Sequence, residues 1–163
     1  MSSACAHTPH TTAGHSTPLS EAAPVEIEIA KPGTADAFWR THDRDWRSEL
    51  WDFRVVWHAQ TYDIVARDGT LAIAGLRLRI AASLAHIDAL YVLPAYRKRG
   101  LGRLLLARGE ELAKYHNCHK VTIEVFAEHA AQAFLERCGY KTEAVLAQHT
   151  FKLDTAVLRK FLL

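Results

Sequence analysis

The chain has 163 residues, of which 49% are hydrophobic, enough for one compact domain with a buried core and too few residues for a second domain of ordinary size. Its 20 basic and 18 acidic residues leave a net charge of +2, so we expect neither a nucleic-acid nor a membrane partner. Three irregularly spaced cysteines and the lack of a signal-peptide pattern predict a cytoplasmic protein.

The first part of the chain divides into a tail and the beginning of a folded domain. Residues 1–24 are rich in Ser, Thr, Ala, His and Pro and hold no aromatic residue, so we expect a disordered tail before a domain over residues 25–163. VEIEIA, residues 25–30, alternates apolar and acidic residues and predicts a half-buried strand. Apolar residues then recur mostly at spacings of three, four or seven and predict one or two helices. They are Phe38, Trp39, Trp46, Leu50, Trp51 and Phe53.

The later segments predict a mixed α/β fold. Residues 62–80, YDIVARDGTLAIAGLRLRI, have the pattern of two strands around an Asp-Gly turn, and residues 84–92, LAHIDALYV, predict a third strand. Amphipathic spacing predicts a helix from Leu101 to about Tyr115. HKVTIEVF predicts another strand, AEHAAQAFLERCGY a short helix that ends at Gly139, and KTEAVLAQHTFKLD a last strand before a short apolar end.

The segment VLPAYRKRGLG, residues 92–102, joins a predicted strand to a predicted helix and favours a phosphate ligand. Free backbone N–H groups at a helix N-terminus attract anions, and Gly100 and Gly102 let oxygen atoms approach the backbone closely. The surrounding positive charges come from Arg97, Lys98, Arg99 and Arg103. An ordinary solvated turn is the alternative. A nucleoside-triphosphate loop is excluded because Gly-x-x-x-x-Gly-Lys-Ser/Thr is absent, and a dinucleotide fingerprint because Leu105 replaces its third glycine.

Arg97, Gly100 and Gly102 stand at the three defining positions of a motif, Gln/Arg-x-x-Gly-x-Gly/Ala. The chain therefore resembles the Gcn5-related N-acetyltransferase superfamily, and the resemblance extends to the Asp-Gly hairpin and to AFLERCGY. It implies a mixed, mostly antiparallel central sheet with helices on both faces. It also implies acetyl-CoA as co-substrate, with its pyrophosphate on the backbone of residues 97–102. The implied site comprises the strand residues Leu90, Tyr91 and Val92, which would bind the pantetheine arm, and the loop residues Arg97, Lys98, Arg99, Gly100, Leu101, Gly102 and Arg103.

The catalytic candidates are His86 and Asp88 in LAHIDALYV. Strict alternation would place His86, Asp88, Leu90 and Val92 on one face of the strand. Imidazole suits a base near neutral pH, and His86 occupies a position similar to that of the base in some family members, with Asp88 able to orient it. The alternative is that both are half-exposed strand residues with no chemical role.

Two departures from the family pattern keep a second function open. Many members carry a Tyr that protonates the leaving thiolate, and Leu135 stands there; Cys138, Tyr140 or water could replace it. Glu128 stands at the family's frequent Asn position. The expected activity is acetyl transfer to a primary amine of a small molecule or peptide by direct attack in a ternary complex. The alternative is a regulatory module that binds CoA without turnover.

Three further expectations concern ligands and partners. The segment HNCH, residues 116–119, lacks distant partner ligands, so we predict a solvated turn and no metal. A nucleic-acid role for RKRGLGR is disfavoured, because its cations are confined to one loop. A homodimer formed through the β-rich C-terminal part is a further expectation.

Overall fold

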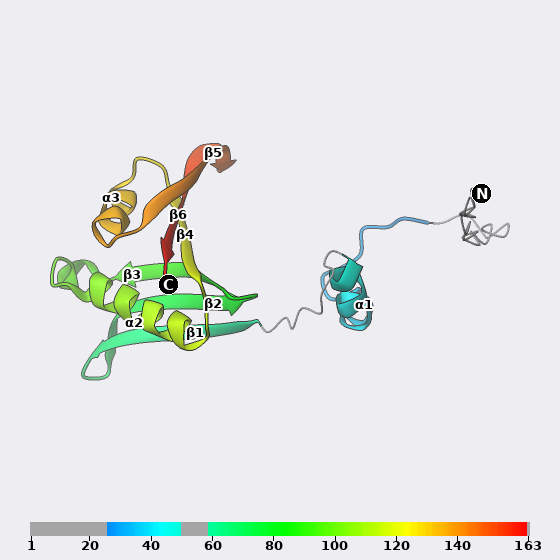
Figure 1. The fold of residues 1–163 in the computed structure, drawn as a ribbon, viewed down its shortest axis with the longest axis horizontal. Coiled ribbons are helices and arrows are strands. Elements are labelled where there is room, and N and C mark those ends of the chain that lie inside the picture. The colour runs from blue at the N-terminus through cyan, green and yellow to red at the C-terminus, as the bar shows by residue number, and fades with distance from the viewer. Residues whose placement is uncertain (1–25, 50–58, 163) are drawn as a thin grey trace, which may run out of the picture. The chain divides into compact units, whose positions relative to one another are not determined.

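The computed structural model describes residues 26–49 and 59–162, drawn in colour in Figure 1. The chain divides between Asp45 and Trp46 into two units, the first with most of helix α1 (Asp36–Glu49) and the second with the sheet and the other helices. The predicted tail over residues 1–24 lies outside the described residues, as do Leu50, Trp51 and Phe53 of the predicted helical region. None of the described helices is both long and apolar enough to span a membrane.

The expectation of a strand over residues 25–30 is wrong for its described part. Residues 26–30 form no strand, and the side chains of Ile27 and Ile29 are exposed. Alternation states which side chains would share a face, but a strand also needs a hydrogen-bonding neighbour, which alternation does not specify. Helix α1 begins after a turn in which the Asp36 N–H donates to the Gly33 carbonyl at 3.1 Å.

The second unit is built on one six-stranded sheet with the order β1-β2-β3-β4-β6-β5. All neighbours are antiparallel except β3 and β4, which run parallel. The strands are β1 (Gln60–Asp68), β2 (Leu71–Ala81), β3 (Leu84–Val92), β4 (Lys120–Phe126), β5 (Lys141–Thr150) and β6 (Leu153–Phe161). The predicted mixed α/β class with a mostly antiparallel sheet is confirmed.

Two turns of the sheet use residues that the sequence patterns do not single out. The predicted turn at Gly69 is present, with φ at +58°. Between β2 and β3, however, Ala82 and Ser83 have φ values of 51° and 60°, and between β5 and β6 Phe151 and Lys152 have 51° and 61°. Strand β6 follows the second of these turns. It contains the C-terminal apolar segment and is an inner strand, between β4 and β5, where we expected only a short apolar end.

Two of the described helices cover the sheet of the second unit. Helix α2 (Leu101–Tyr115) packs on β1, β2 and β3, and α3 (Ala130–Arg137) packs on β4, β5 and β6 (Figure 1). Their buried side chains, among them Leu105, Leu106 and Leu135, join strand residues such as Leu78 and Val121 in one apolar core. Burial of this kind contributes roughly 25 cal/mol per Å² of apolar surface, so this core holds both helices against the sheet.

Strands β3 and β4 separate after a short parallel ladder. Their pairing runs from Leu84 with Lys120 to Ile87 with Ile123 and ends there. Beyond that point β3 stays paired with β2 as far as Val92, while β4 stays paired with β6 as far as Phe126. The sheet therefore forks between β3 and β4, and the fork opens toward the N-terminus of α2.

Candidate active site

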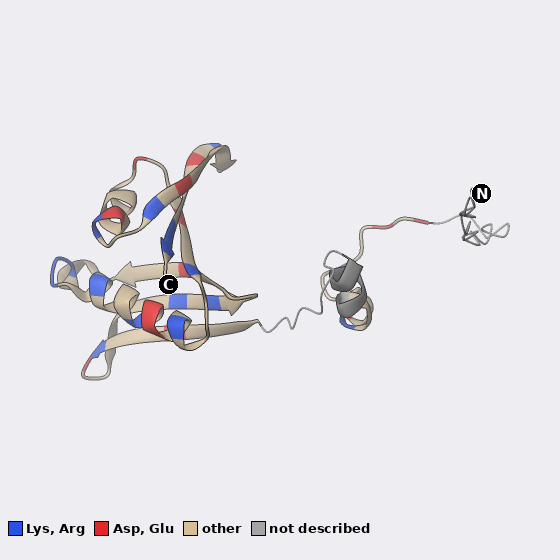
Figure 2. Cartoon of the chain, viewed as in Figure 1, with Lys and Arg blue, Asp and Glu red and all other residues tan. Residues whose placement is uncertain are grey.

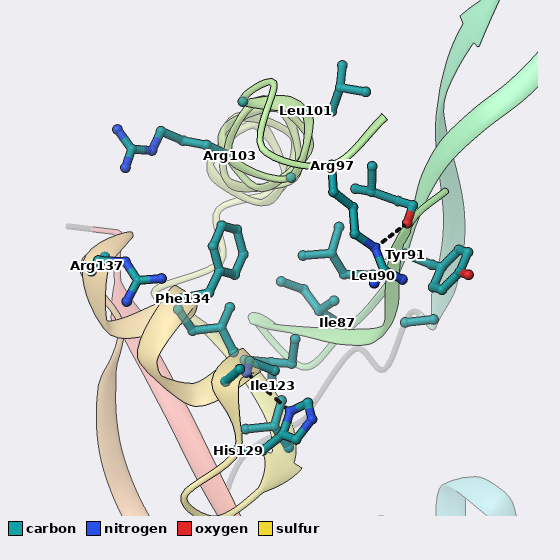
Figure 3. A pocket seen from close by; sticks show the side chains of 18 of the residues that line it. Ile87, Leu90, Tyr91, Arg97, Leu101, Arg103, Ile123, His129, Phe134 and Arg137 are labelled. Atoms are coloured by element: carbon teal, nitrogen blue, oxygen red, sulfur yellow. Dashed lines mark hydrogen bonds between the residues drawn. The ribbon is translucent and has the colours of Figure 1, made fainter. Parts of the chain in front are cut away.

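A cleft of about 790 Å³ occupies the fork. One wall is β3 from Ile87 to Val92 with the loop that leads into α2, and the other is β4 with α3. Figure 3 shows the apolar side chains Ile87, Leu90, Ile123 and Phe134 toward the inside, and arginines toward the rim. The lining is thus mostly apolar with charge at its edge, as in many ligand-binding sites.

The loop between β3 and α2 presents a run of free backbone donors. Gly100 is the N-cap of α2 with φ at +84°, and Lys98 also has a positive φ, at +61°. In the described part of the chain, the consecutive N–H groups from Lys98 to Arg103 donate to no backbone or side-chain acceptor. The helix dipole adds partial positive charge at the same place. This geometry is typical of nests that bind anions.

Two of the four predicted cations hold the loop in place. Arg97 Nε donates to the Val92 carbonyl at 3.0 Å, and its guanidinium lies 5.5 Å from the centre of the Tyr91 ring. Arg99 lies 5.2 Å from the Tyr96 ring and does not line the cleft. Figure 2 marks these cations in the loop at the start of α2. The pKa of Tyr96 is in turn raised, because its hydroxyl donates a hydrogen bond to the Asp68 carboxylate at 2.9 Å.

Gly102 serves helix packing as well as access to the backbone. A Cβ at this position would lie 3.1 Å from Cζ of Phe134, which is closer than nine in ten natural contacts of a Cβ atom. Gly100, in contrast, has no atom of a described residue within 4 Å of such a Cβ, and its positive φ alone explains the glycine. The sequence analysis expected both glycines to admit ligand oxygens, and the structure adds the contact between α2 and α3 as a reason for Gly102.

The expectation that His86, Asp88, Leu90 and Val92 share one face is wrong. Ile87 pairs with Leu78 and Ala89 with Arg77, so Asp88 is the extra residue of a β-bulge. The bulge shifts the alternation, and Leu90 and Val92 therefore pack against the same core as Ile87. Tyr91, on the opposite side, is 56% exposed.

His86 and Asp88 nevertheless lie near each other at the root of the fork. His86 Nδ1 is 2.9 Å from Thr122 Oγ1 on β4, and its Nε2 is 3.8 Å from Asp88 Oδ1. Asp88 accepts hydrogen bonds from Arg79 at 3.2 and 3.3 Å. Asp88 lines the cleft and His86 does not, so His86 stands behind the cleft wall.

The Thr122 hydroxyl indicates which nitrogen of His86 carries the proton. It donates to the Ala85 carbonyl at 3.4 Å, so its oxygen is available to accept the Nδ1–H of His86. In a neutral imidazole with Nδ1 protonated, the lone pair lies on Nε2. That nitrogen points to the side of Asp88.

Several cleft residues were not predicted from the sequence. They come from β4 and α3 and include Glu124, His129, Phe134 and Arg137. Alternation along β4 could have indicated Glu124, because residues two apart share a face of a strand and Thr122 contacts His86. The other three residues have no such signal. His129 Nδ1 accepts the Ala131 N–H at 3.2 Å and caps α3.

Neither the position of the family's proton-donating Tyr nor its two candidate protein substitutes brings a proton donor to the cleft. Leu135 lines the cleft but is buried and carries no proton donor. Cys138 lines a neighbouring cavity instead, and Tyr140 lines neither of them. The hydroxyl of Tyr140 makes no hydrogen bond of ordinary geometry to a described residue. Burial, followed by the effect of Glu110, raises the pKa of Tyr140.

Comparisons with known proteins agree with this geometry. A model of the acetyltransferase (GNAT) family matches residues 32–140. An acetyltransferase from Bacillus cereus has a similar structure, with a TM-score of 0.70 and 20% identity over 84% of this chain and 97% of that one. A provisionally named acetyltransferase from Agrobacterium tumefaciens gives 0.66 and 22%, over 84% and 99%. No curated protein sequence matches the chain.

A third similar structure contains acetyl coenzyme A. It is a provisionally named streptothricin acetyltransferase from Bacillus anthracis in complex with acetyl coenzyme A, with a TM-score of 0.58 and 20% identity over 62% of each chain. The chain belongs to the GNAT acetyltransferase family, because the family model covers the loop, the fork and both helices of the cleft. Members of this family use acetyl-CoA as acetyl donor.

Proposed function

We propose that this protein is an N-acetyltransferase that moves the acetyl group of acetyl-CoA to a primary amine of a small molecule or peptide. The observation that supports it most directly is the run of free N–H groups from Lys98 to Arg103 at the rim of an apolar cleft. A pyrophosphate fits such a nest, and an apolar cleft fits a long pantetheine arm. Acetyl-CoA, when bound, supplies an acetyl thioester that an amine can attack.

The residues proposed to bind the donor fall into two groups. The backbone of Arg97, Lys98, Arg99, Gly100, Leu101, Gly102 and Arg103 surrounds the pyrophosphate. The edge of β3 over Leu90, Tyr91 and Val92 faces the gap left by β4, and there it can pair with the amides of the arm as a neighbouring strand would. Arg97 acts mainly by fixing the loop to the end of β3.

His86 is the proposed base. An ammonium must lose a proton before its nitrogen can attack the thioester, and Nε2 of His86 carries the free lone pair. Because His86 stands behind the cleft wall, the proton passes through a water molecule at the root of the fork. Thr122 orients the ring through Nδ1, and Asp88, which Arg79 holds, stabilises the imidazolium that forms.

A general base is sufficient without a general acid, because the thiolate of coenzyme A is a good leaving group. A thiol has an ordinary pKa of about 8.5, so a thiolate can leave without a protein acid and take its proton from water. The absence of a hydroxyl at Leu135 is therefore compatible with turnover. The alternative, a regulatory module, would bind CoA through the same loop and release no thiol.

Calorimetry with acetyl-CoA tests this function, together with a thiol-release assay against a panel of amines. Gly100→Trp fills the nest, and Gly69→Trp places the same side chain at another positive φ, away from the cleft. We expect binding by the wild type and by Gly69→Trp, loss of binding in Gly100→Trp, and thiol release with at least one amine. Binding without thiol release on a broad panel would favour the regulatory module. No binding by the wild type would refute the proposal.

The sheet edge at β5 supports a second proposal, that the protein forms a homodimer. Strand β5 is an edge strand of ten residues, most of them exposed, and Val145 on it is 55% exposed. Edge strands of this kind offer free backbone groups to a second chain. Size-exclusion chromatography with light scattering gives the mass directly, and a monomer at high concentration would contradict the pairing.

A further inference from the structure

A second cavity, of about 280 Å³, lies beside the cleft, and two arginines line both. Arg103 is in the first turn of α2, and Arg137 is the last residue of α3. Figure 3 shows both on the side of the cleft away from Arg97 and Tyr91. The boundary between the two cavities is therefore positively charged and distinct from the part of the loop that Arg97 fixes.

The packing of the two helices determines where these arginines stand. Phe134 would lie within 3.1 Å of a Cβ at Gly102, so α2 and α3 approach closely at this point. Arg103 follows Gly102 directly, and Arg137 lies three residues, about one helical turn, after Phe134. Glu110, two turns after Arg103 on α2, lines the same cavity.

The other two charged residues of the second cavity pair with each other and not with the two arginines. Lys160 is held by Glu110, with its Nζ 2.8 Å from Oε2, and also donates to the Cys138 carbonyl at 3.1 Å. These two charges offset each other. Within residues 26–49 and 59–162, the side chains of Arg103 and Arg137 take part in no hydrogen bond or ion pair. Two unneutralised guanidinium groups at a cavity boundary form a site for an anion with several oxygens.

We propose that Arg103 and Arg137 bind the phosphate monoester on the ribose of coenzyme A and thereby select the donor that carries it. The inference rests on the proposed acetyl-CoA site. The free N–H groups of the loop account for the pyrophosphate, and the monoester is the anionic group of the donor that they leave without a partner. Near pH 7 a phosphate monoester carries between one and two negative charges, which two arginines can match.

A structural role for the same residues is the competing explanation. Arg137 at the end of α3 also interacts favourably with the helix dipole, and a cation near the loop could serve the pyrophosphate alone. Neither role distinguishes coenzyme A from 3′-dephospho-coenzyme A, which lacks only the monoester. A comparison of these two compounds therefore separates the explanations.

The experiment is calorimetry of both compounds on the full chain. The proteins are the wild type, Arg103→Gln, Arg137→Gln, the double variant and Arg108→Gln. Arg108 is a matched control, because it is on α2 but pairs with Glu111 at 2.8 Å. We expect the wild type and Arg108→Gln to bind coenzyme A about tenfold more tightly than the dephospho compound, as two partly exposed charged contacts allow. The double variant should bind both compounds equally.

The outcomes distinguish this inference from the proposed function. If the wild type binds both compounds with equal affinity, the monoester has no site and the inference is overturned. A preference that persists in the double variant would assign the monoester to other residues and also overturn it. Failure of both compounds to bind would contradict the acetyl-CoA site itself. Thermal unfolding of each variant shows whether a loss of binding reflects loss of the fold.

Discussion

Gly102 can be tested for helix packing by a double-mutant cycle with Phe134. In Gly102→Ala the new methyl group lies 3.1 Å from Phe134 Cζ, so the ring or the helix must shift. Overpacking of this kind costs roughly 1–3 kcal/mol, whereas the replacement of a helical glycine by alanine contributes up to about 1 kcal/mol of stability. We therefore expect Gly102→Ala to destabilise the protein by up to about 2 kcal/mol.

Phe134→Leu should reverse the sign of that effect. Leucine lacks the ring atoms that meet the new methyl group, so Gly102→Ala in the Phe134→Leu background should stabilise the protein by up to about 1 kcal/mol. Urea unfolding of the wild type, both single variants and the double variant gives a coupling free energy, for which we expect about 1–3 kcal/mol. Additive effects, within about 0.5 kcal/mol, would show that the contact does not explain Gly102.

Two further predictions concern other residues of the cleft and the core. His86→Gln should lower kcat roughly 100-fold or more with the best amine of the panel, as loss of a general base does. Calorimetry should show an unchanged affinity for acetyl-CoA, because His86 does not line the cleft. An unchanged kcat would remove His86 from the mechanism. Tyr140→Phe should leave the protein as stable at pH 7 or more stable, because the deleted hydroxyl is buried and makes no hydrogen bond of ordinary geometry to a described residue. The pKa of Tyr140 is raised in the folded state, so wild-type stability falls by up to about 1.4 kcal/mol per pH unit above pH 10, where the unfolded tyrosine ionises and the folded one keeps its proton. Urea unfolding between pH 7 and 11 should show a shallower fall in Tyr140→Phe, and parallel curves would contradict this account.

The elements with strong local signals were predicted from the sequence. The Asp-Gly turn appears at Gly69, and the short helix α3 is followed by a left-handed Gly139 with φ at +90°. Amphipathic spacing gave α2 from Leu101 to Tyr115, as observed. These signals are local, because turns, helix caps and helix faces depend on residues only a few positions apart.

The missed features depend on tertiary context or on unusual residues. Phe151 and Lys152 adopt positive φ values without being Gly or Asn, so no turn signal separated β5 from β6. The bulge at Asp88 interrupts the alternation, and the only hint is the spacing of three between the apolar Ile87 and Leu90. Arg137 belongs to the cleft solely because α3 packs beside α2, which no spacing within its own segment indicates.

The short ladder between β3 and β4 has a consequence for local opening of the fold. Four residue pairs, from Leu84 with Lys120 to Ile87 with Ile123, join the two halves of the sheet. In the free protein, backbone amides of residues 88–92 that point into the gap lack a strand partner and should exchange their hydrogens quickly with solvent. A ligand that pairs with this edge would slow that exchange and couple the two halves, so the donor would act as a removable strand of the sheet.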